Sequence, residues 1–209
     1  FSGDGGLATL AKLNLPQGVA TDLAGNIYIA DSNNFRIRRV SAANGTIGTI
    51  AGNGAPFTAG DGGLASGASF TSPRRIAIDF AGNIFIVDRS SNSHIRRIDA
   101  TSGIITTVAG GGTLTGDSGP ATQMNLGLLT DVAVDGGGGF VTTSGFRVFA
   151  VQNDTCTAIA GTGAQGFSGD GGDPLLATFN NISGVAIDGQ GEFYVSVRSN
   201  IRIRALVLS

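Results

Sequence analysis

The sequence has little of what metal enzymes and disulfide-bonded scaffolds require. Its 209 residues contain no tryptophan, one cysteine, one histidine and one methionine. A single cysteine excludes an intramolecular disulfide, and a zinc centre needs three or four converging ligands. The composition therefore excludes a histidine-based zinc site and a disulfide framework within this chain.

Charge is also scarce, and neither sign dominates. Only 13% of the residues are charged, the formal net charge is −2, and no basic block is longer than a pair such as Arg38-Arg39. Nucleic acid is therefore not an expected partner. No apolar run approaches the roughly 18–20 residues that cross a bilayer, so we expect no membrane insertion in this segment.

Glycine is what the sequence has in excess. The 35 glycines make up about one residue in six and follow no collagen period. Glycine disfavours the interiors of helices and strands, so this content predicts many tight turns between short strands. The composition favours an all-β fold.

An internal repeat divides the chain. A Gly-Asp-rich tetrapeptide recurs at offsets of 57, 56 and 53 residues, at 3–6, 60–63, 116–119 and 169–172. The repeats run approximately over residues 1–57, 58–113, 114–166 and 167–209. A fixed period of this length is typical of repeat folds.

Each repeat predicts a set of short strands separated by turn residues. First strands are expected at 18–22, 75–79, 131–135 and 184–188, and second strands at 27–30, 84–87, 140–143 and 193–196. Third strands are expected at 36–40, 94–98, 147–151 and 202–206. Fourth strands are expected at 49–52, 107–110 and 158–161. Four antiparallel strands per repeat predict the blade of a β-propeller.

The motifs resemble those of the NHL-repeat family. The segment Asp22–Asp31 and its counterpart Asp79–Asp88 follow the family pattern throughout, whereas the third and fourth copies depart from it, for example at Ser144 and Val197. The resemblance implies a single NHL-type propeller domain over 1–209, or part of a propeller with about six blades. The sequence stops at Ser209, where a fourth outer strand is expected, so we expect a longer polypeptide, a second chain or a small four-bladed closure to cover the exposed sheet.

Two motifs suggest chemistry that their context does not support. Residues 116–120 spell Gly-Asp-Ser-Gly-Pro, as around a serine-protease nucleophile, but Ser118 occupies a connector position and the sole His94 lies in an expected strand. Residues 161–166 fit a dinucleotide fingerprint, but no βαβ unit surrounds them. We interpret both as structural connectors.

The recurring connector aspartates leave one metal hypothesis open. Each repeat has one such aspartate among glycines: Asp4, Asp61, Asp117 and Asp170. Capping of the turn by the carboxylate explains their recurrence, and calcium binding is the alternative hypothesis. No other cofactor is expected. Cys156 is expected to be a buried apolar residue, with an intermolecular bridge as the alternative.

Three glycosylation sequons suggest an exported protein. They begin at Asn44, Asn153 and Asn181, and the first two fall in expected turns between third and fourth strands. With little lysine or glutamate on the surface, we expect an extracellular or cell-surface location and possible N-glycosylation at these asparagines.

Polar loops after the second strands are the candidate binding loops. The side chains considered are Asp31, Asn33, Asn34, Asp88, Ser91 and Asn92. Loops near a propeller axis often contact ligands, but pairing of Asp31 and Asp88 with third-strand arginines such as Arg38 and Arg96 is the alternative that we favour.

The sequence predicts no catalytic residue. We expect a non-catalytic interaction or assembly module that binds protein or glycan partners through blade loops or exposed strand edges, with homo-oligomerisation or a longer chain as alternatives for assembly. A metal-dependent lyase or lactonase whose site lies in other blades, and a receptor sensor domain, remain the other readings.

Overall fold

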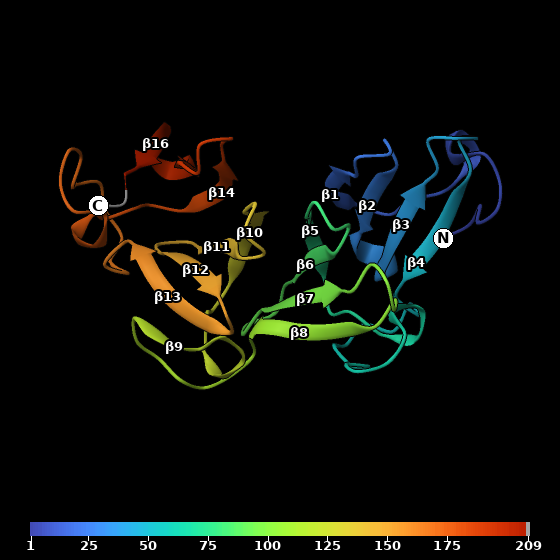
Figure 1. The fold of residues 1–209 in the computed structure, drawn as a ribbon, viewed down its shortest axis with the longest axis horizontal. Helices are drawn as coiled ribbons and strands as arrows, with labels where there is room; N and C mark the ends of the chain where they lie inside the picture. The colour runs from blue at the N-terminus through green and yellow to red at the C-terminus, as the bar shows by residue number, and fades with distance from the viewer. Residues whose placement is uncertain (208–209) are drawn as a thin grey trace. The chain divides into compact units, whose positions relative to one another are not determined.

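The computed structural model describes residues 1–207 and shows an all-β chain built from four propeller-type blades (Figure 1). Two compact units divide it. The first contains residues 1–90 and 95–107, and the second contains residues 91–94 and 108 onward. Among the described residues no helix is long and apolar enough to span a bilayer.

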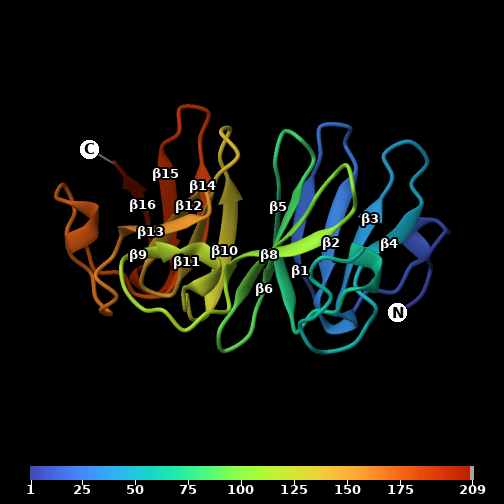
Figure 2. The same ribbon diagram turned by 60° about the horizontal axis from the view of Figure 1, so that its bottom comes forward.

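Blades 1 and 2 are four-stranded antiparallel sheets in sequential order. Blade 1 contains β1 (Pro16–Thr21), β2 (Ile27–Asp31), β3 (Arg36–Val40) and β4 (Ile47–Ala51). Blade 2 contains β5 (Pro73–Ile78), β6 (Ile84–Asp88), β7 (His94–Ile98) and β8 (Ile105–Gly110). The strands of each blade lie side by side in Figure 2.

Blade 3 has five strands and blade 4 has three. Blade 3 contains β10 (Leu129–Val134), β11 (Phe140–Ser144), β12 (Val148–Gln152), β13 (Thr155–Ala160) and β9 (Ser118–Pro120), in that spatial order. Blade 4 contains β14 (Ile182–Ile187), β15 (Phe193–Val197) and β16 (Arg202–Leu206). The repeat therefore predicted every strand except β9. The first strands of all blades, β4 and β8 begin two residues earlier than expected, and β13 begins three residues earlier.

Short 3₁₀ turns are the only helical elements described in residues 1–207. They are η1 (Ala8–Leu10), η2 (Ser32–Asn34), η3 (Ala65–Gly67), η4 (Ala121–Gln123), η5 (Pro174–Leu176) and η6 (Arg198–Asn200). The first of them, η1, ends where Ala11 adopts an extended conformation.

The connectors between blades are packed segments. In the first unit, Phe70 from a connector is fully buried in a cluster with Ile37 of blade 1 and Ile86 of blade 2. In the second unit, Phe179 is buried in the same way with Val148 and Val195. Each blade has two apolar faces, and the interior between two facing sheets must be closely packed. The connector phenylalanine fills space between the sheets that their own side chains do not occupy.

The outer edges of the complete blades are covered by the connector that precedes them. Gly5 N–H donates to Ile47 O at 2.8 Å, and Ile47 N–H donates to Gly6 O at 3.0 Å. In blade 3 this contact is long enough to form β9, which pairs with β13. An unpaired strand edge invites pairing with other chains, and these connectors remove that edge in blades 1 to 3.

Candidate functional site

The connector aspartates pair with third-strand arginines. In blade 2, the fully buried Arg96 binds Asp61 at 2.6 Å and donates to the carbonyl oxygens of Ser69 at 3.1 Å and Ala59 at 3.2 Å. The three contacts hold two parts of the connector, residues 59–61 and Ser69, against β7. We call this arrangement the connector ion pair.

The same ion pair recurs in blades 1 and 4. Arg38 binds Asp4 at 2.5 Å, and Arg204 binds Asp170 at 2.7 Å. In blade 3, Phe149 replaces the inner arginine, and Arg147 instead binds Asp117 at 2.8 Å. Turn capping was therefore the wrong explanation for these aspartates, because the arginine partner becomes adjacent only after the connector folds back on its blade.

The electrostatics of Asp61 follow from this geometry. Burial raises the pKa of the carboxyl, but hydrogen bonds from Thr107 and the charge of Arg96 outweigh burial, so the net pKa lies below its usual range. Thr107 N–H donates to Asp61 Oδ2 at 3.0 Å. A carboxylate that already has an arginine and an amide donor has less capacity for calcium.

No metal cluster accompanies these aspartates. Within residues 1–207, no group of three or more His, Cys, Asp or Glu side chains could hold a metal ion. Ser118 of the protease-like motif lies in β9, where its hydroxyl is 3.2 Å from that of Thr157. Cys156 is fully buried in β13, and burial raises the pKa of its thiol to about 11.

The first candidate binding loop contains one internal and one surface side chain. Asp31 is fully buried and accepts hydrogen bonds from Asn14 N–H at 2.7 Å and Asn34 Nδ2 at 2.8 Å, with Arg38 at 3.5 Å. Asn33 is exposed and Asn34 is half-buried. The expected pairing of Asp31 with Arg38 is thus observed, and of these asparagines Asn33 is the more accessible to a partner.

The second candidate loop also buries its aspartate, but Arg96 forms its ion pair with Asp61 rather than with Asp88 as expected. Asp88 is fully buried and accepts hydrogen bonds from Thr58 Oγ1 at 2.6 Å and Ser72 N–H at 2.8 Å. Ser91 is exposed, and Asn92 is half-buried and donates to Gly112 O at 2.6 Å. Ligand contact through these loops stays a prediction, and the side chains available for it are Asn33 and Ser91 rather than the aspartates.

All three sequon asparagines are exposed. Asn44 accepts hydrogen bonds from the Thr46 amide and hydroxyl at 3.1 and 2.8 Å. Asn153 lies in the turn between β12 and β13 with φ 48°, and Asn181 precedes β14 with φ 62°. Their placement permits modification, and glycosylation itself stays a prediction.

The turn between the first and second strands of blade 1 is held by Asp22. Asp22 Oδ1 accepts from Asn26 N–H at 2.9 Å, and its Oδ2 accepts from the Asn26 amide at 2.7 Å and the Tyr28 hydroxyl at 3.0 Å. The Asn26 side chain is the largest cause that lowers the pKa of Asp22. These residues stabilise a hairpin turn and do not form a site.

The feature that the loop analysis missed lies on blade 4. Ile203 is 70% exposed, whereas its counterparts Ile37, Ile95 and Val148 are all 0% exposed. Val19 of blade 1 is 67% exposed, whereas its counterpart Ile76 is 7% exposed. Aligning the repeats reveals these positions as core positions, but only their accessibility shows that two sheet faces are open.

Comparison with known proteins agrees with this architecture. A model of the NHL repeat matches residues 13–40, and a model of the teneurin NHL domain matches residues 53–135. The chain belongs to the NHL-repeat family.

Relatives and solved structures extend the similarity over most of this NHL-repeat chain. Teneurin-4 of Mus musculus is 32% identical over 229 aligned residues, which cover 97% of this chain and 8% of teneurin-4. The matched segments span 5–8% of the length of the teneurins.

Two bacterial structures share the fold at low identity. An auxiliary nutrient binding protein from Bacteroides thetaiotaomicron has a TM-score of 0.66 and 19% identity, covering 90% of this chain and 46% of its own. Virginiamycin B lyase from Staphylococcus aureus has a TM-score of 0.53 and 13% identity, covering 91% and 54%.

Proposed function

We propose that this NHL-repeat chain is a non-catalytic interaction or assembly module of an exported or cell-surface protein. Its partner is a protein or glycan, which it binds through blade loops, sheet faces or strand edges. The match to teneurin NHL domains supports a propeller used for interaction, and the exposed sequon asparagines support the exported setting.

The observation that carries the proposal is the exposure of blade-core positions. Ile203 is 70% exposed, whereas its counterparts Ile37, Ile95 and Val148 are 0% exposed; Val19 is 67% exposed, whereas its counterpart Ile76, which packs in the cluster shared by blades 1 and 2, is 7% exposed. An exposed apolar sheet face is a typical interaction surface in a soluble chain. A polypeptide that covers these faces repeats the contact that blades 1 and 2 make with each other.

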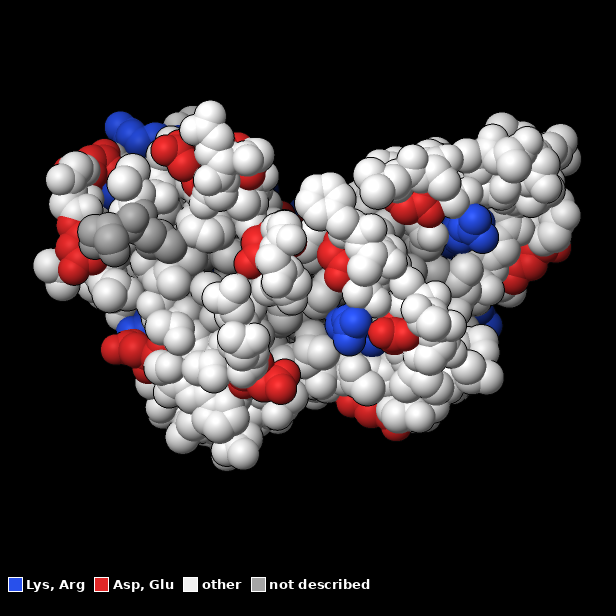
Figure 3. All heavy atoms as spheres, viewed as in Figure 1, with Lys and Arg blue, Asp and Glu red and all other residues white. Residues whose placement is uncertain are grey.

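Charged side chains are sparse and mixed in sign on the face of the molecule that Figure 3 draws. On the face drawn in Figure 3, acidic and basic side chains are scattered among uncharged ones and form no extended block of one sign. An interface core that lacks charge is typical of stable protein contacts.

Self-association tests the proposal directly. We expect light scattering to detect species larger than the 20.9 kDa chain as concentration rises. Ile203→Asp should abolish them, since a carboxylate in an apolar contact has no partner there. Leu176→Asp is the matched control, because Leu176 is also 70% exposed but lies in the connector turn η5.

Two results would overturn the use of the open faces. One is a single-chain mass at every concentration together with equal binding of a dye that reports exposed apolar surface by wild type and Ile203→Asp. The other is equal loss of association in both aspartate variants.

A further inference from the structure

The first strand of every blade contains a bulge at its second residue. The pairing register shifts there, so this residue has no partner in the second strand. Bulges redirect side chains and are over-represented next to active sites. The four unpaired residues are all polar, namely Gln17, Arg74, Thr130 and Ser183.

The bulge residues of the first unit bond to each other across two blades. Arg74 Nη1 donates to Gln17 Oε1 at 2.9 Å. The strands β1 and β5 lie next to each other (Figure 1) and approach so closely that a Cβ on Gly18 would lie 2.9 Å from Arg75 Cα. In blades 3 and 4 the corresponding hydroxyls bond within their own blade instead. The absence of a side chain at Gly18 thus allows Gln17 and Arg74 to meet.

A second arginine lies beside Arg74. Arg89 follows β6, and its N–H donates to Ser72 O at 2.9 Å, which holds it next to the start of β5. Burial lowers the pKa of Arg74, and the positive charges of Arg89 and Arg75 lower it further. Within residues 1–207, neither Arg74 nor Arg89 forms an ion pair with a carboxylate. Two positive charges are therefore held together without compensation.

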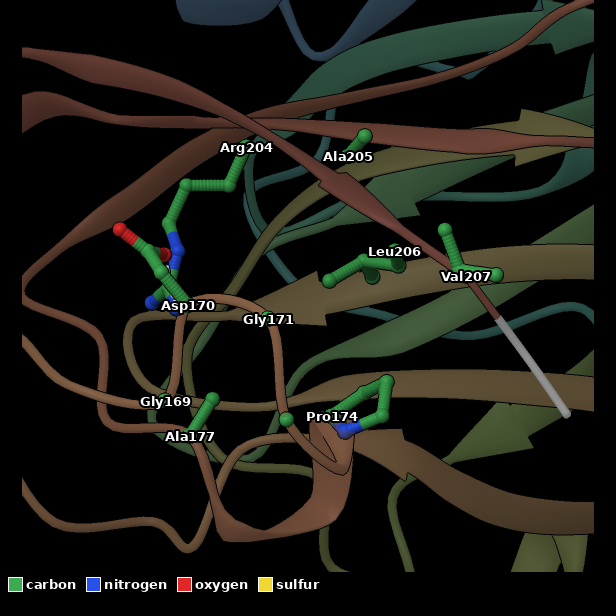
Figure 4. A pocket seen from close by; sticks show the side chains of 10 residues that line it. Gly169, Asp170, Gly171, Pro174, Ala177, Arg204, Ala205, Leu206 and Val207 are labelled. Atoms are coloured by element: carbon green, nitrogen blue, oxygen red, sulfur yellow. Dashed lines mark ion pairs between the residues drawn. The ribbon is translucent and has the colours of Figure 1, made fainter.

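This arrangement contrasts with the rest of the chain. In every blade an arginine binds a connector aspartate, as Figure 4 shows for Arg204 and Asp170 at 2.7 Å. The carboxylate of Asp88, which precedes Arg89, is not available to it. That carboxylate accepts hydrogen bonds from Thr58 Oγ1 at 2.6 Å and from two backbone N–H groups.

The groups that remain available are all hydrogen-bond donors. Gln17 Oε1 is used by Arg74, which leaves the Gln17 amide hydrogens, and Arg74 Nε has no hydrogen-bond partner among the described residues. The three side chains, including that of Arg89, are half-buried, so water screens their charges less than on an open surface. A half-buried group of donors without acceptors selects an anion.

One small anionic group fits this site better than a polyanion. The chain has a net charge of −2 and no basic block longer than a pair, so an extended polyanion has no basic surface to follow. A carboxylate has two oxygens with about four acceptor positions, enough for Gln17, Arg74 and Arg89 together. The chain already uses this chemistry internally, since each connector ion pair joins an arginine to an aspartate in a glycine-rich segment.

We propose that Gln17, Arg74 and Arg89 form a binding site for the side-chain carboxylate of an aspartate in a partner polypeptide. All three residues belong to the first unit, and both arginines lie in the second repeat, which has a repeat on each side. This inference rests on the proposed interaction function and names the chemistry of the partner.

Two capped peptides test the site. N-acetyl-Gly-Asp-Gly-Gly-amide carries one carboxylate, and N-acetyl-Gly-Asn-Gly-Gly-amide is its neutral match. We expect the Asp peptide to shift the NMR signals of the Arg74 and Arg89 Nε–H groups and of the Gln17 amide saturably. The Asn peptide should bind at least about ten-fold more weakly, because it lacks the charge-assisted hydrogen bonds. Inorganic phosphate, added separately, distinguishes a carboxylate site from a general oxyanion site.

Matched variants of the chain separate the site from net charge. Arg89→Gln removes a guanidinium that makes no hydrogen bond within residues 1–207 and should weaken binding of the Asp peptide about ten-fold. Arg39→Gln is the control, because it changes the net charge equally at an exposed position of β3, and it should change binding less than about two-fold.

An internal carboxylate should compete with the ligand. Gln17→Glu places a carboxylate at the side chain that Arg74 already contacts. We expect this variant to unfold at a higher temperature than wild type and to lose binding of the Asp peptide, because its own carboxylate compensates the arginines.

The outcomes separate this proposal from the general one. Equal binding of the two peptides, tighter binding of phosphate than of the Asp peptide, equal effects of Arg89→Gln and Arg39→Gln, or undiminished binding by Gln17→Glu would each overturn the carboxylate site. Loss of self-association in Ile203→Asp without binding of the Asp peptide would leave the interaction function standing and refute only this site.

Discussion

Replacing Arg96 with methionine should destabilise the first unit by about 3 kcal/mol. Arg96→Met removes two charge-assisted hydrogen bonds to the carbonyls of Ser69 and Ala59, each worth about 1.5 kcal/mol at the low end. The ion pair with Asp61 adds less than about 1 kcal/mol because 46% of the Asp61 side chain is exposed. The apolar packing of the methionine side chain offsets part of this loss of stability.

Because the chain contains no tryptophan, the fluorescence of a single tyrosine can report the unfolding of one unit. The two tyrosines, Tyr28 and Tyr194, lie in different units, so a Tyr194→Phe background leaves one tyrosine signal from the first unit. Urea unfolding followed by this fluorescence gives the free energy of unfolding with and without Arg96→Met. Arg97→Met is the matched control, since Arg97 makes a half-exposed pair with Asp99 at 3.2 Å and should cost under about 1 kcal/mol.

The pH dependence separates the ion pair from the carbonyl bonds. The pKa of Asp61 is lowered in the folded chain, so its contribution is present above the unfolded value of about 3.9 and is lost as pH falls through the folded pKa. The stability difference between wild type and Arg96→Met should therefore shrink between pH 7 and pH 3. A cost below about 1 kcal/mol at pH 7, or one equal to that of Arg97→Met, would refute the role of the connector ion pair.

Three further predictions follow from single residues. Cys156, buried and with its pKa raised to about 11, should not react with a thiol reagent at pH 8 until the chain is unfolded, and prompt stoichiometric labelling of native protein would contradict its burial. Gly161→Ala should lower the free energy of unfolding in urea by about 2 kcal/mol, because the new Cβ would contact Phe146 O. Gly45→Ala should lower it by about 1 kcal/mol, because Gly45 has a positive φ but open space around it. Equal losses in the two variants would contradict the steric argument. Asn26→Ala should raise the pKa of Asp22 in an NMR titration, and the acid limit of stability should move to higher pH as that carboxyl protonates earlier; an unchanged pKa would count against the Asn26 hydrogen bond as its cause.

Local patterns in the sequence determined the elements of this protein. The tetrapeptide period predicted four blades, and the turn residues between the expected strands predicted hairpins such as that between β1 and β2. These predictions succeeded because turn geometry and strand alternation depend on neighbours only a few residues away.

Contacts between distant residues decided what those elements do. Asp4 and Arg38 are 34 residues apart, and neither motif alone reveals that they form an ion pair. The burial of Asp31 and Asp88, which leaves Asn33 and Ser91 as the accessible loop side chains, also depends on how each connector folds back.

The open surfaces required the tertiary structure for the same reason. The repeats predict that Ile37 and Ile203 occupy equivalent positions, but burial is a property of what packs against a side chain and not of its place in a motif. The sequence alone thus determined the strands of each blade, and only the folded chain revealed that Asp170 and Arg204 form an ion pair.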